Sequence, residues 1–146
     1  MKLSDYFRNL AERFRRVATS QDPNVSQLVH DAAAQGLRLL KLTNDEGIIT
    51  LANVEWPIPY QKLIDDRVVG WSTAWQGIIA EFCCQHPDKL GAPIQSLQTD
   101  ADFRAAAELS ARVAEWLAEQ IENAAVGKAE MPSGKLICRE VFFQLL

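Results

Sequence analysis

The chain has 146 residues, of which 48% are hydrophobic and 23% are charged, and its formal net charge is −4. A chain of this length buries about 70% of the surface that its unfolded form exposes, which supports one hydrophobic core but not two. The apolar fraction is that of a globular protein and the apolar runs are short, so the composition excludes intrinsic disorder and a transmembrane segment. We predict a single domain over residues 1–146.

The net charge is divided unevenly along the chain. Residues 1–20 carry a net charge of +3, and the rest of the chain carries −7. Much of the negative charge lies in residues 96–130, where seven acidic side chains stand against three basic ones. An acidic chain argues against nucleic acid as a partner, because binding to phosphates needs clustered Lys and Arg. We expect a basic surface near the start of the chain and an acidic surface near its end.

The cysteine content indicates a reducing compartment. Cys83, Cys84 and Cys138 are odd in number and two of them are adjacent, which is not the pattern of a disulfide framework. The first residues lack the long apolar run of a secretory signal, and their acidic side chains argue against an organellar transit peptide. We therefore expect a cytoplasmic protein.

The first part of the chain predicts two amphipathic helices and a short strand. Ser4 is a suitable N-cap, and apolar residues recur every three or four positions from there to about residue 18. A second helix is predicted from about Val25 to Lys41, and Gly36 weakens it in the middle. Residues 48–52 follow a glycine and begin with three β-branched side chains, so they favour a strand.

The second part of the chain predicts further helices. A short helix ends at Gly70, and Ser72 can cap the helix that follows it. Residues 87–99 have little periodicity and predict a loop. The longest helix is predicted over residues 100–125. Residues 136–145 alternate like a strand, but Ile137, Val141 and Leu145 also fit a helix, so both alternatives stay open there.

These elements together predict the fold class. The simplest architecture is a mainly α, single-domain bundle of about five helices. A small two-stranded pairing of residues 48–52 with residues 136–145 is a possible addition to it.

The run Cys83-Cys84-Gln85-His86 holds the side chains of zinc sites and thiol redox sites. Adjacent cysteines on a helix diverge by about 100 degrees, which is poor geometry for one metal ion. Only His30 and Cys138 remain to complete a set of four ligands. We therefore predict no metal and no cofactor, interpret Cys83 as a core residue, and keep thiol redox chemistry as an alternative.

The segment Gly70-Trp71-Ser72-Thr73-Ala74 resembles the nucleophile elbow G-x-S-x-G of serine hydrolases, but the final glycine is missing. A serine nucleophile needs a base. His86 is predicted at the other end of the same helix, about 20 Å away by helical rise. His30 could approach Ser72 only through tertiary packing. We interpret Ser72 as an N-cap and keep the hydrolase as an alternative.

The strongest functional prediction concerns the first helix. Phe7 and Phe14 share one face, and Arg8 and Arg15 lie around it, which suits docking onto an acidic protein partner. The basic helix of one copy could also meet the acidic long helix of another copy, since opposite charges on one chain make it self-complementary. Trp116 lies off the main apolar stripe of its helix and would serve as an interface anchor.

The sequence thus predicts a non-enzymatic helical interaction or assembly protein that self-associates, most simply as a homodimer. Its partner-binding residues would be Phe7, Arg8, Phe14, Arg15 and Trp116. The alternative is a small thiol-based redox or metal-binding protein, or a serine hydrolase. Its weaker candidate residues are Cys83, Cys84, His86 and Ser72.

Overall fold

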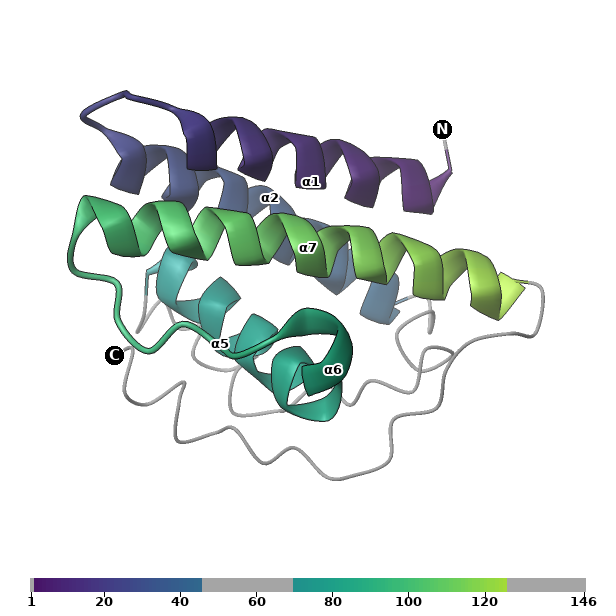
Figure 1. The fold of residues 1–146 in the computed structure, drawn as a ribbon. Coiled ribbons are helices and arrows are strands. Elements are labelled where there is room, and N and C mark those ends of the chain that lie inside the picture. The colour runs from purple at the N-terminus through teal and green to yellow at the C-terminus, as the bar shows by residue number, and fades with distance from the viewer. Residues whose placement is uncertain (1, 46–69, 126–146) are drawn as a thin grey trace.

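The computed structural model describes residues 2–45 and 70–125. Within these residues there are five helices and no strand (Figure 1), and the helices are α1 (Leu3–Thr19), α2 (Val25–Asp45), α5 (Trp71–Gln85), α6 (Pro87–Leu90) and α7 (Asp100–Ala125). This confirms the prediction of a mainly α bundle of about five helices. The predicted pairing of residues 48–52 with residues 136–145 lies outside the described residues, as does the short helix predicted before Gly70.

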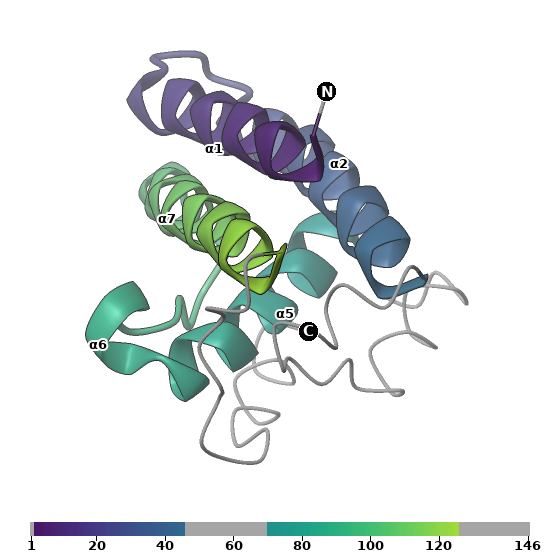
Figure 2. The same ribbon diagram turned by 90° about the vertical axis from the view of Figure 1, so that its right-hand side faces the viewer.

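The helices pack in two levels. α1, α2 and α7 lie side by side, and α1 and α7 pack against each other in opposite directions along most of α1 (Figures 1 and 2). α5 packs beneath them against α2 and α7, and α6 follows α5 and also contacts α7. The N-termini of α2, α5 and α7 therefore point toward the same end of the molecule (Figure 1).

The core lies where the apolar faces of these helices meet. Phe7, Leu10 and Phe14 recur at helical spacing on α1, and all three side chains are fully buried. Trp75 of α5 is also fully buried and stacks on Phe14, with ring centroids 5.8 Å apart and an interplanar angle of 11°. On α2, Gly36 lies directly against the indole ring of Trp75. α1 and α2 thus share one aromatic centre with α5.

A small polar network ties α5 to α7 inside the core. The indole N–H of Trp75 and the amide nitrogen of Gln76 donate to Ser110 Oγ over 3.0 and 2.8 Å. Ser110 Oγ in turn donates to the carbonyl oxygen of Ala106 over 2.6 Å. The hydroxyl of Ser110 is therefore fully satisfied although the residue is completely buried, as the cost of burying polar groups requires.

Two of the predicted helix starts are wrong. The first helix begins at Leu3, so Ser4 lies inside its first turn, and the backbone N–H of Lys2 donates to the Asp5 carboxylate over 3.2 Å instead. α5 begins at Trp71 with Gly70 as its N-cap, so Ser72 also lies inside a first turn and does not cap the helix. In both cases the serine lies too far into the helix for its hydroxyl to take the capping position.

The boundaries of the other helices differ less from the prediction. The predicted helix over 100–125 is observed as α7, and its predicted start at Asp100 is confirmed. α2 continues to Asp45, beyond the predicted end near Lys41. The predicted loop over 87–99 contains the short helix α6, whose first residue is proline, which is favoured at that position. Within residues 2–45 and 70–125, no helix combines the length and hydropathy that a membrane span requires.

Candidate functional site

Cys83 does not have the environment of a reactive thiol. Cys83 is 1% exposed, and burial raises the pKa of its thiol to about 12. Because the thiolate is the reactive form, a buried and protonated thiol is a poor nucleophile and a poor metal ligand. Cys83 packs among the apolar residues of the core, as the sequence predicted for it. Cys84, by contrast, is disulfide-bonded, which differs from the expectation of reduced cysteines and leaves it no free thiol. Cys138 lies outside the described residues.

His86, at the C-terminus of α5, packs against an aromatic ring. Its imidazole and the indole of Trp116 have centroids 4.6 Å apart. Burial, with a smaller effect from Lys89, lowers the pKa of His86. Its Nε2 atom is buried and has no hydrogen-bond partner among the described residues, so a proton there would gain no acceptor from them. Among the described residues, no group of three or more His, Cys, Asp or Glu side chains could hold a metal ion.

The aromatic residues predicted to bind a partner lie inside the fold. Phe7 and Phe14 are 0% exposed and Trp116 is 5% exposed. Trp116 is buried because α1 covers one side of α7, and α5 and α6 cover another. The apolar surface of α7 is therefore wider than a single contact face. In this arrangement the three rings contribute to the core and are not accessible to a partner.

The arginines of the first helix have acidic partners within the same chain. Arg8 and Arg15 lie two turns apart on α1, and they pair with Glu122 and Glu115, which lie two turns apart on α7. Arg8 Nη2 is 3.2 Å from Glu122 Oε2, and Arg15 Nη1 is 2.9 Å from Glu115 Oε1. The charges that suggested contact between two copies therefore meet between two helices of one copy.

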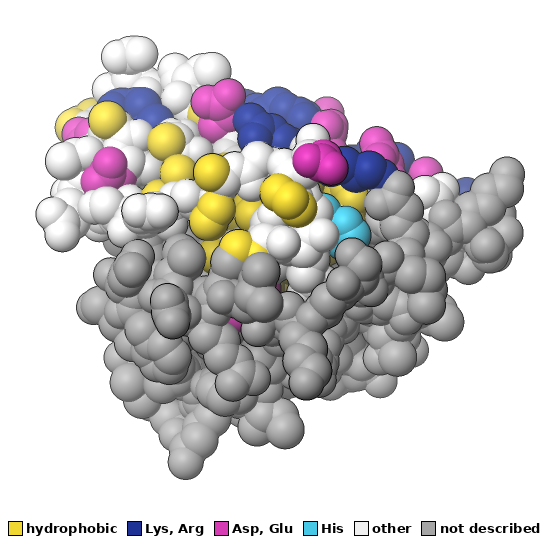
Figure 3. Space-filling model, turned by 60° about the horizontal axis from the view of Figure 1, so that its bottom comes forward, with side chains coloured by type: hydrophobic (Ala, Val, Ile, Leu, Met, Phe, Trp, Pro, Cys, Tyr) yellow, Lys and Arg dark blue, Asp and Glu magenta, His cyan; other side chains and the backbone are white. Residues whose placement is uncertain are grey.

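These ion pairs affect ionisation more clearly than stability. Hydrogen bonds from Arg8 and Arg15 lower the pKa values of Glu122 and Glu115. All four side chains are between 41% and 48% exposed, and pairs in that setting contribute little because water screens them. On the face drawn in Figure 3, positive and negative side chains lie next to one another, not in separate patches. The expected division into a basic and an acidic surface is not seen on this face.

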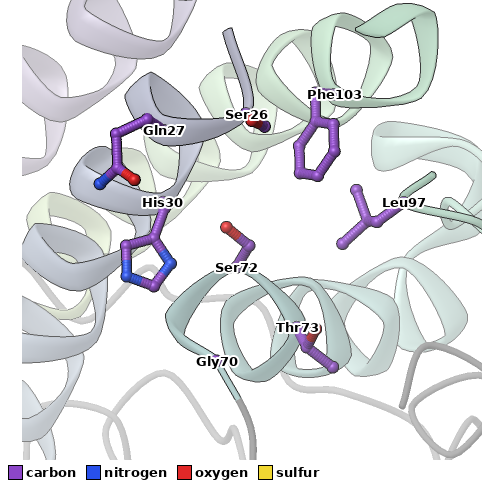
Figure 4. A pocket seen from close by; sticks show the side chains of 8 residues that line it. All are labelled: Ser26, Gln27, His30, Gly70, Ser72, Thr73, Leu97 and Phe103. Atoms are coloured by element: carbon purple, nitrogen blue, oxygen red, sulfur yellow. The ribbon is translucent and has the colours of Figure 1, made fainter. Parts of the chain in front are cut away.

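A pocket of about 330 Å³ lies at the end of the molecule where the N-termini of α2, α5 and α7 meet (Figure 4). The described residues that line it come from these three helices and the segments before α5 and α7: Ser26, Gln27, His30, Gly70, Ser72, Thr73, Leu97 and Phe103. No acidic side chain is among them. The pocket therefore combines polar hydrogen-bonding groups with an apolar side formed by Leu97 and Phe103.

Ser72 is the most distinctive residue of this pocket. It is only 8% exposed, and its hydroxyl makes no hydrogen bond with the described part of the chain. Figure 4 shows the hydroxyl pointing away from α5 into the space between α2 and Phe103. Because the hydroxyl faces the pocket, water or a ligand can supply the hydrogen bond that the described residues do not. The position of Ser72 thus leaves room for a hydrogen-bonding ligand.

The backbone beside Ser72 also has free donors. α5 has no side-chain cap, and its first turn contains no acidic residue. The first backbone hydrogen bond of this turn runs from the N–H of Ala74 to the carbonyl of Gly70 over 3.0 Å, which leaves the N–H groups of Trp71, Ser72 and Thr73 without a partner among the described residues. Such free N–H groups at a helix N-terminus favour an anion.

At the neighbouring N-terminus of α7, by contrast, an acidic side chain lies against the backbone N–H groups that precede the helix. The Asp102 carboxylate accepts hydrogen bonds from the backbone N–H groups of Gln98 and Thr99 over 3.0 and 3.1 Å. These hydrogen bonds lower the pKa of Asp102. The Thr99 hydroxyl accepts from the N–H of Asp102 over 3.1 Å, which completes a capping box. α7 therefore supplies its own anion, whereas α5 has none in its first turn.

The pocket brings together two residues that the sequence treated separately. His30 of α2 and Ser72 of α5 line the same cavity, so tertiary packing brings these two residues to one site. No hydrogen bond joins them in the described structure, and no acidic side chain among the described lining residues orients the imidazole. The pocket thus contains a serine and a histidine, but among the described residues it lacks the hydrogen bond between them and the acidic side chain that would orient the histidine.

A second cavity, of about 320 Å³, lies beside Trp116. Lys89 and Arg112 line it together with Glu115 and Glu119, so its described wall carries charges of both signs and favours no ligand charge. The indole N–H of Trp116 is buried without a partner and is closed to solvent. The pocket at the N-terminus of α5 is therefore the stronger candidate site.

Comparisons with known proteins give no further identification: no protein family, curated protein or solved structure matches this chain. The functional inference consequently depends on the geometry of the pocket itself.

Proposed function

We propose that this domain is a non-enzymatic binding protein that holds a small anion at the N-terminus of α5. The observation that carries the proposal is the Ser72 side chain, which is 8% exposed, unpartnered within the described structure and directed into the pocket. A bound anion would accept hydrogen bonds from this hydroxyl and from the free backbone N–H groups of the same turn.

The electrostatics of the pocket favour a negative ligand. The N-terminus of a helix carries about half a positive elementary charge, and it is most effective where no acidic side chain neutralises it. Neither α2 nor α5 has an acidic residue in its first turn, and both contribute lining residues, Ser26 and Ser72. The first turn of α7 carries Asp100 and Asp102, but neither side chain is among the described lining residues. His30 adds a further side-chain donor on the α2 side, whereas the amide nitrogen of Gln27 already donates to the Asp31 carboxylate over 2.8 Å.

Substitution of Gly70 tests the proposal with opposite effects on stability and binding. A Cβ at Gly70 would meet nothing within 4 Å, so a larger side chain fits there. Gly70→Asp should cap α5 and raise the free energy of unfolding by roughly a few tenths of a kcal/mol. Its carboxylate would occupy the anion position, so binding of inorganic phosphate, measured by isothermal titration calorimetry, should be lost although the fold is stabilised.

Gly70→Asn is the matched control, because asparagine has the same size and capping ability without the charge. The asparagine variant should retain more phosphate binding than the aspartate variant. If wild-type protein binds no phosphate, or if both variants bind it as wild type does, the proposed site does not exist.

Ser72→Ala tests the hydroxyl alone. We expect phosphate affinity to fall by about ten- to hundredfold, as expected when a hydrogen bond to a charged ligand is removed. The free energy of unfolding should change by less than about 0.5 kcal/mol, because the hydroxyl has no partner in the described structure. Unchanged affinity in a stable Ser72→Ala protein would argue against the site.

A serine hydrolase is the second candidate function, since Ser72 and His30 line one pocket. Acyl transfer would require His30 to reach hydrogen-bond distance of the Ser72 hydroxyl and accept its proton. A serine-directed fluorophosphonate tests this directly by mass spectrometry. Labelling that disappears in Ser72→Ala would support the hydrolase, whereas absence of labelling would leave binding as the function of the pocket.

A further inference from the structure

The size of the α5 pocket indicates more than a single inorganic ion. Its volume is about 330 Å³. Cavities that hold organic ligands begin at about 300 Å³ and usually join a few placed polar groups to an apolar surface. The pocket therefore has room for an anionic group together with a small organic group attached to it.

The polar and apolar sides of the pocket are separated in space. Figure 4 shows His30 and Gln27 on one side of Ser72, and Leu97 and Phe103 on the other. Leu97 and Phe103 are both partly exposed, and Phe103 packs against the core on its inner side. An apolar group that covered these two residues would remove their remaining surface from water, which favours binding.

The donors around Ser72 suit a phosphoryl group better than a carboxylate. The backbone N–H groups of Trp71, Ser72 and Thr73 and the Ser72 hydroxyl are free within the described structure, and the Thr73 side chain also lines the pocket. A phosphate monoester offers three terminal oxygens that accept hydrogen bonds, whereas a carboxylate offers two. More of the available donors can therefore be satisfied at once by a phosphate.

We infer that the ligand of this pocket is a small aromatic phosphate monoester. Its phosphate would accept hydrogen bonds at the N-terminus of α5, and its ring would pack on Phe103 and Leu97. This inference rests on the proposed function, because it names the chemical class of the anion held at the same site.

Calorimetric titrations of the full chain with three probes test the inference: phenyl phosphate, inorganic phosphate and benzoate. Phenyl phosphate should bind at least about tenfold more tightly than inorganic phosphate, because only it gains the contact with the aromatic and aliphatic side chains. Benzoate should bind more weakly than phenyl phosphate. In Phe103→Leu, the affinity for phenyl phosphate should fall toward the affinity for inorganic phosphate. Binding of inorganic phosphate should be kept, which would show that the variant is folded.

Each outcome has a distinct meaning. Equal affinity for phenyl phosphate and inorganic phosphate would overturn the aromatic part of the inference and leave anion binding standing. Benzoate binding as tight as phenyl phosphate binding would overturn the phosphoryl part. Absence of binding by all three probes would reject the proposed function and the inference with it. If Phe103→Leu does not fold, the affinities of the three probes for the wild-type chain still test the inference.

Discussion

At the scale of single residues, the packing of Trp75 against α2 explains a glycine that the sequence treats as a weakness. Gly36 lies in the middle of α2, where glycine costs up to about 1 kcal/mol relative to alanine. A Cβ at this position would lie 2.6 Å from Cζ3 of Trp75. The indole cannot easily move, because it stacks on Phe14 and its N–H donates to Ser110. Glycine is therefore required by packing and not by backbone conformation.

Gly36→Ala should lower the free energy of unfolding by about 1–3 kcal/mol, the usual cost of overpacking a core. Helix propensity alone predicts the opposite sign. Urea unfolding followed by circular dichroism measures the change, and Gly70→Ala is the control, because a Cβ there meets nothing within 4 Å. A more stable Gly36→Ala protein would show that α2 and α5 are not packed as described.

His86 should make stability depend on pH near neutrality. Burial lowers its pKa, so the unfolded chain takes up a proton at this residue at a higher pH than the folded chain does. The free energy of unfolding should therefore fall as the pH falls below about 6.5, the ordinary value for histidine. The lowered pKa values of Asp102, Glu115 and Glu122 act in the same direction at lower pH.

An NMR titration of the His86 imidazole checks this prediction at the residue itself. We expect a midpoint below about 6.5, and a higher midpoint in Lys89→Gln, since Lys89 contributes to lowering the pKa. A wild-type midpoint at or above the ordinary histidine value would contradict the buried environment of this ring.

At the scale of helices, the pairing of α1 with α7 explains the uneven charge of the sequence. The same two-turn interval separates Arg8 from Arg15 and Glu115 from Glu122, so two antiparallel helices bring both pairs together in one register. The ion pairs help to select this register, while the buried apolar faces supply most of the stability.

A double-mutant cycle on Arg15→Gln and Glu115→Gln measures one of these pairs. We expect a coupling energy of a few tenths to about 1 kcal/mol at low salt, and a smaller value at high salt because the pair is exposed to solvent. Arg16 is a matched control, since it is an exposed arginine of α1 for which no ion pair is seen in the described structure. Coupling between Arg16 and Glu115 as large as that of Arg15 would contradict the register.

The helices could largely be predicted from the sequence, because helical periodicity is a local property. Residues 100–125 show this most clearly, since all of them are helical in the structure. The N-caps at Ser4 and Ser72 were wrong, because a serine near a helix start has the same appearance whether it lies before the first turn or inside it. The burial of Trp116 was missed because the number of helices that cover α7 is a tertiary property.

At the scale of the whole molecule, the candidate site arises from the convergence of three helix N-termini. Ser72 and His30 were each noticed in the sequence, but 42 positions separate them and only packing makes them neighbours in one pocket. Phe103 and Leu97 gave no functional signal in the sequence, since an aromatic residue in an amphipathic helix usually belongs to the core. The only local signal was a helix start at Gly70-Trp71-Ser72-Thr73 that contains no acidic residue.

Self-association stays a prediction of the sequence, and the structure changes how it should be tested. Arg8 and Arg15 have partners on α7 of the same chain, and Tyr6 is the only large hydrophobic side chain of the described surface that is classed as exposed. Any dimer should therefore persist at high salt, as light scattering coupled to size exclusion can show. A dimer that dissociates at high salt would support the interface between copies that depends on charge. A strict monomer at high micromolar concentration would contradict the prediction of self-association.

The most direct test of anion binding is a titration of ¹⁵N-labelled protein with inorganic phosphate, followed by the backbone amide signals. We predict saturable shifts that are largest at Trp71, Ser72 and Thr73, whose N–H groups are free in the described structure, and that are absent in Gly70→Asp. Amides in this turn that do not shift, or that shift equally in wild-type and Gly70→Asp protein, would contradict an anion site at the N-terminus of α5.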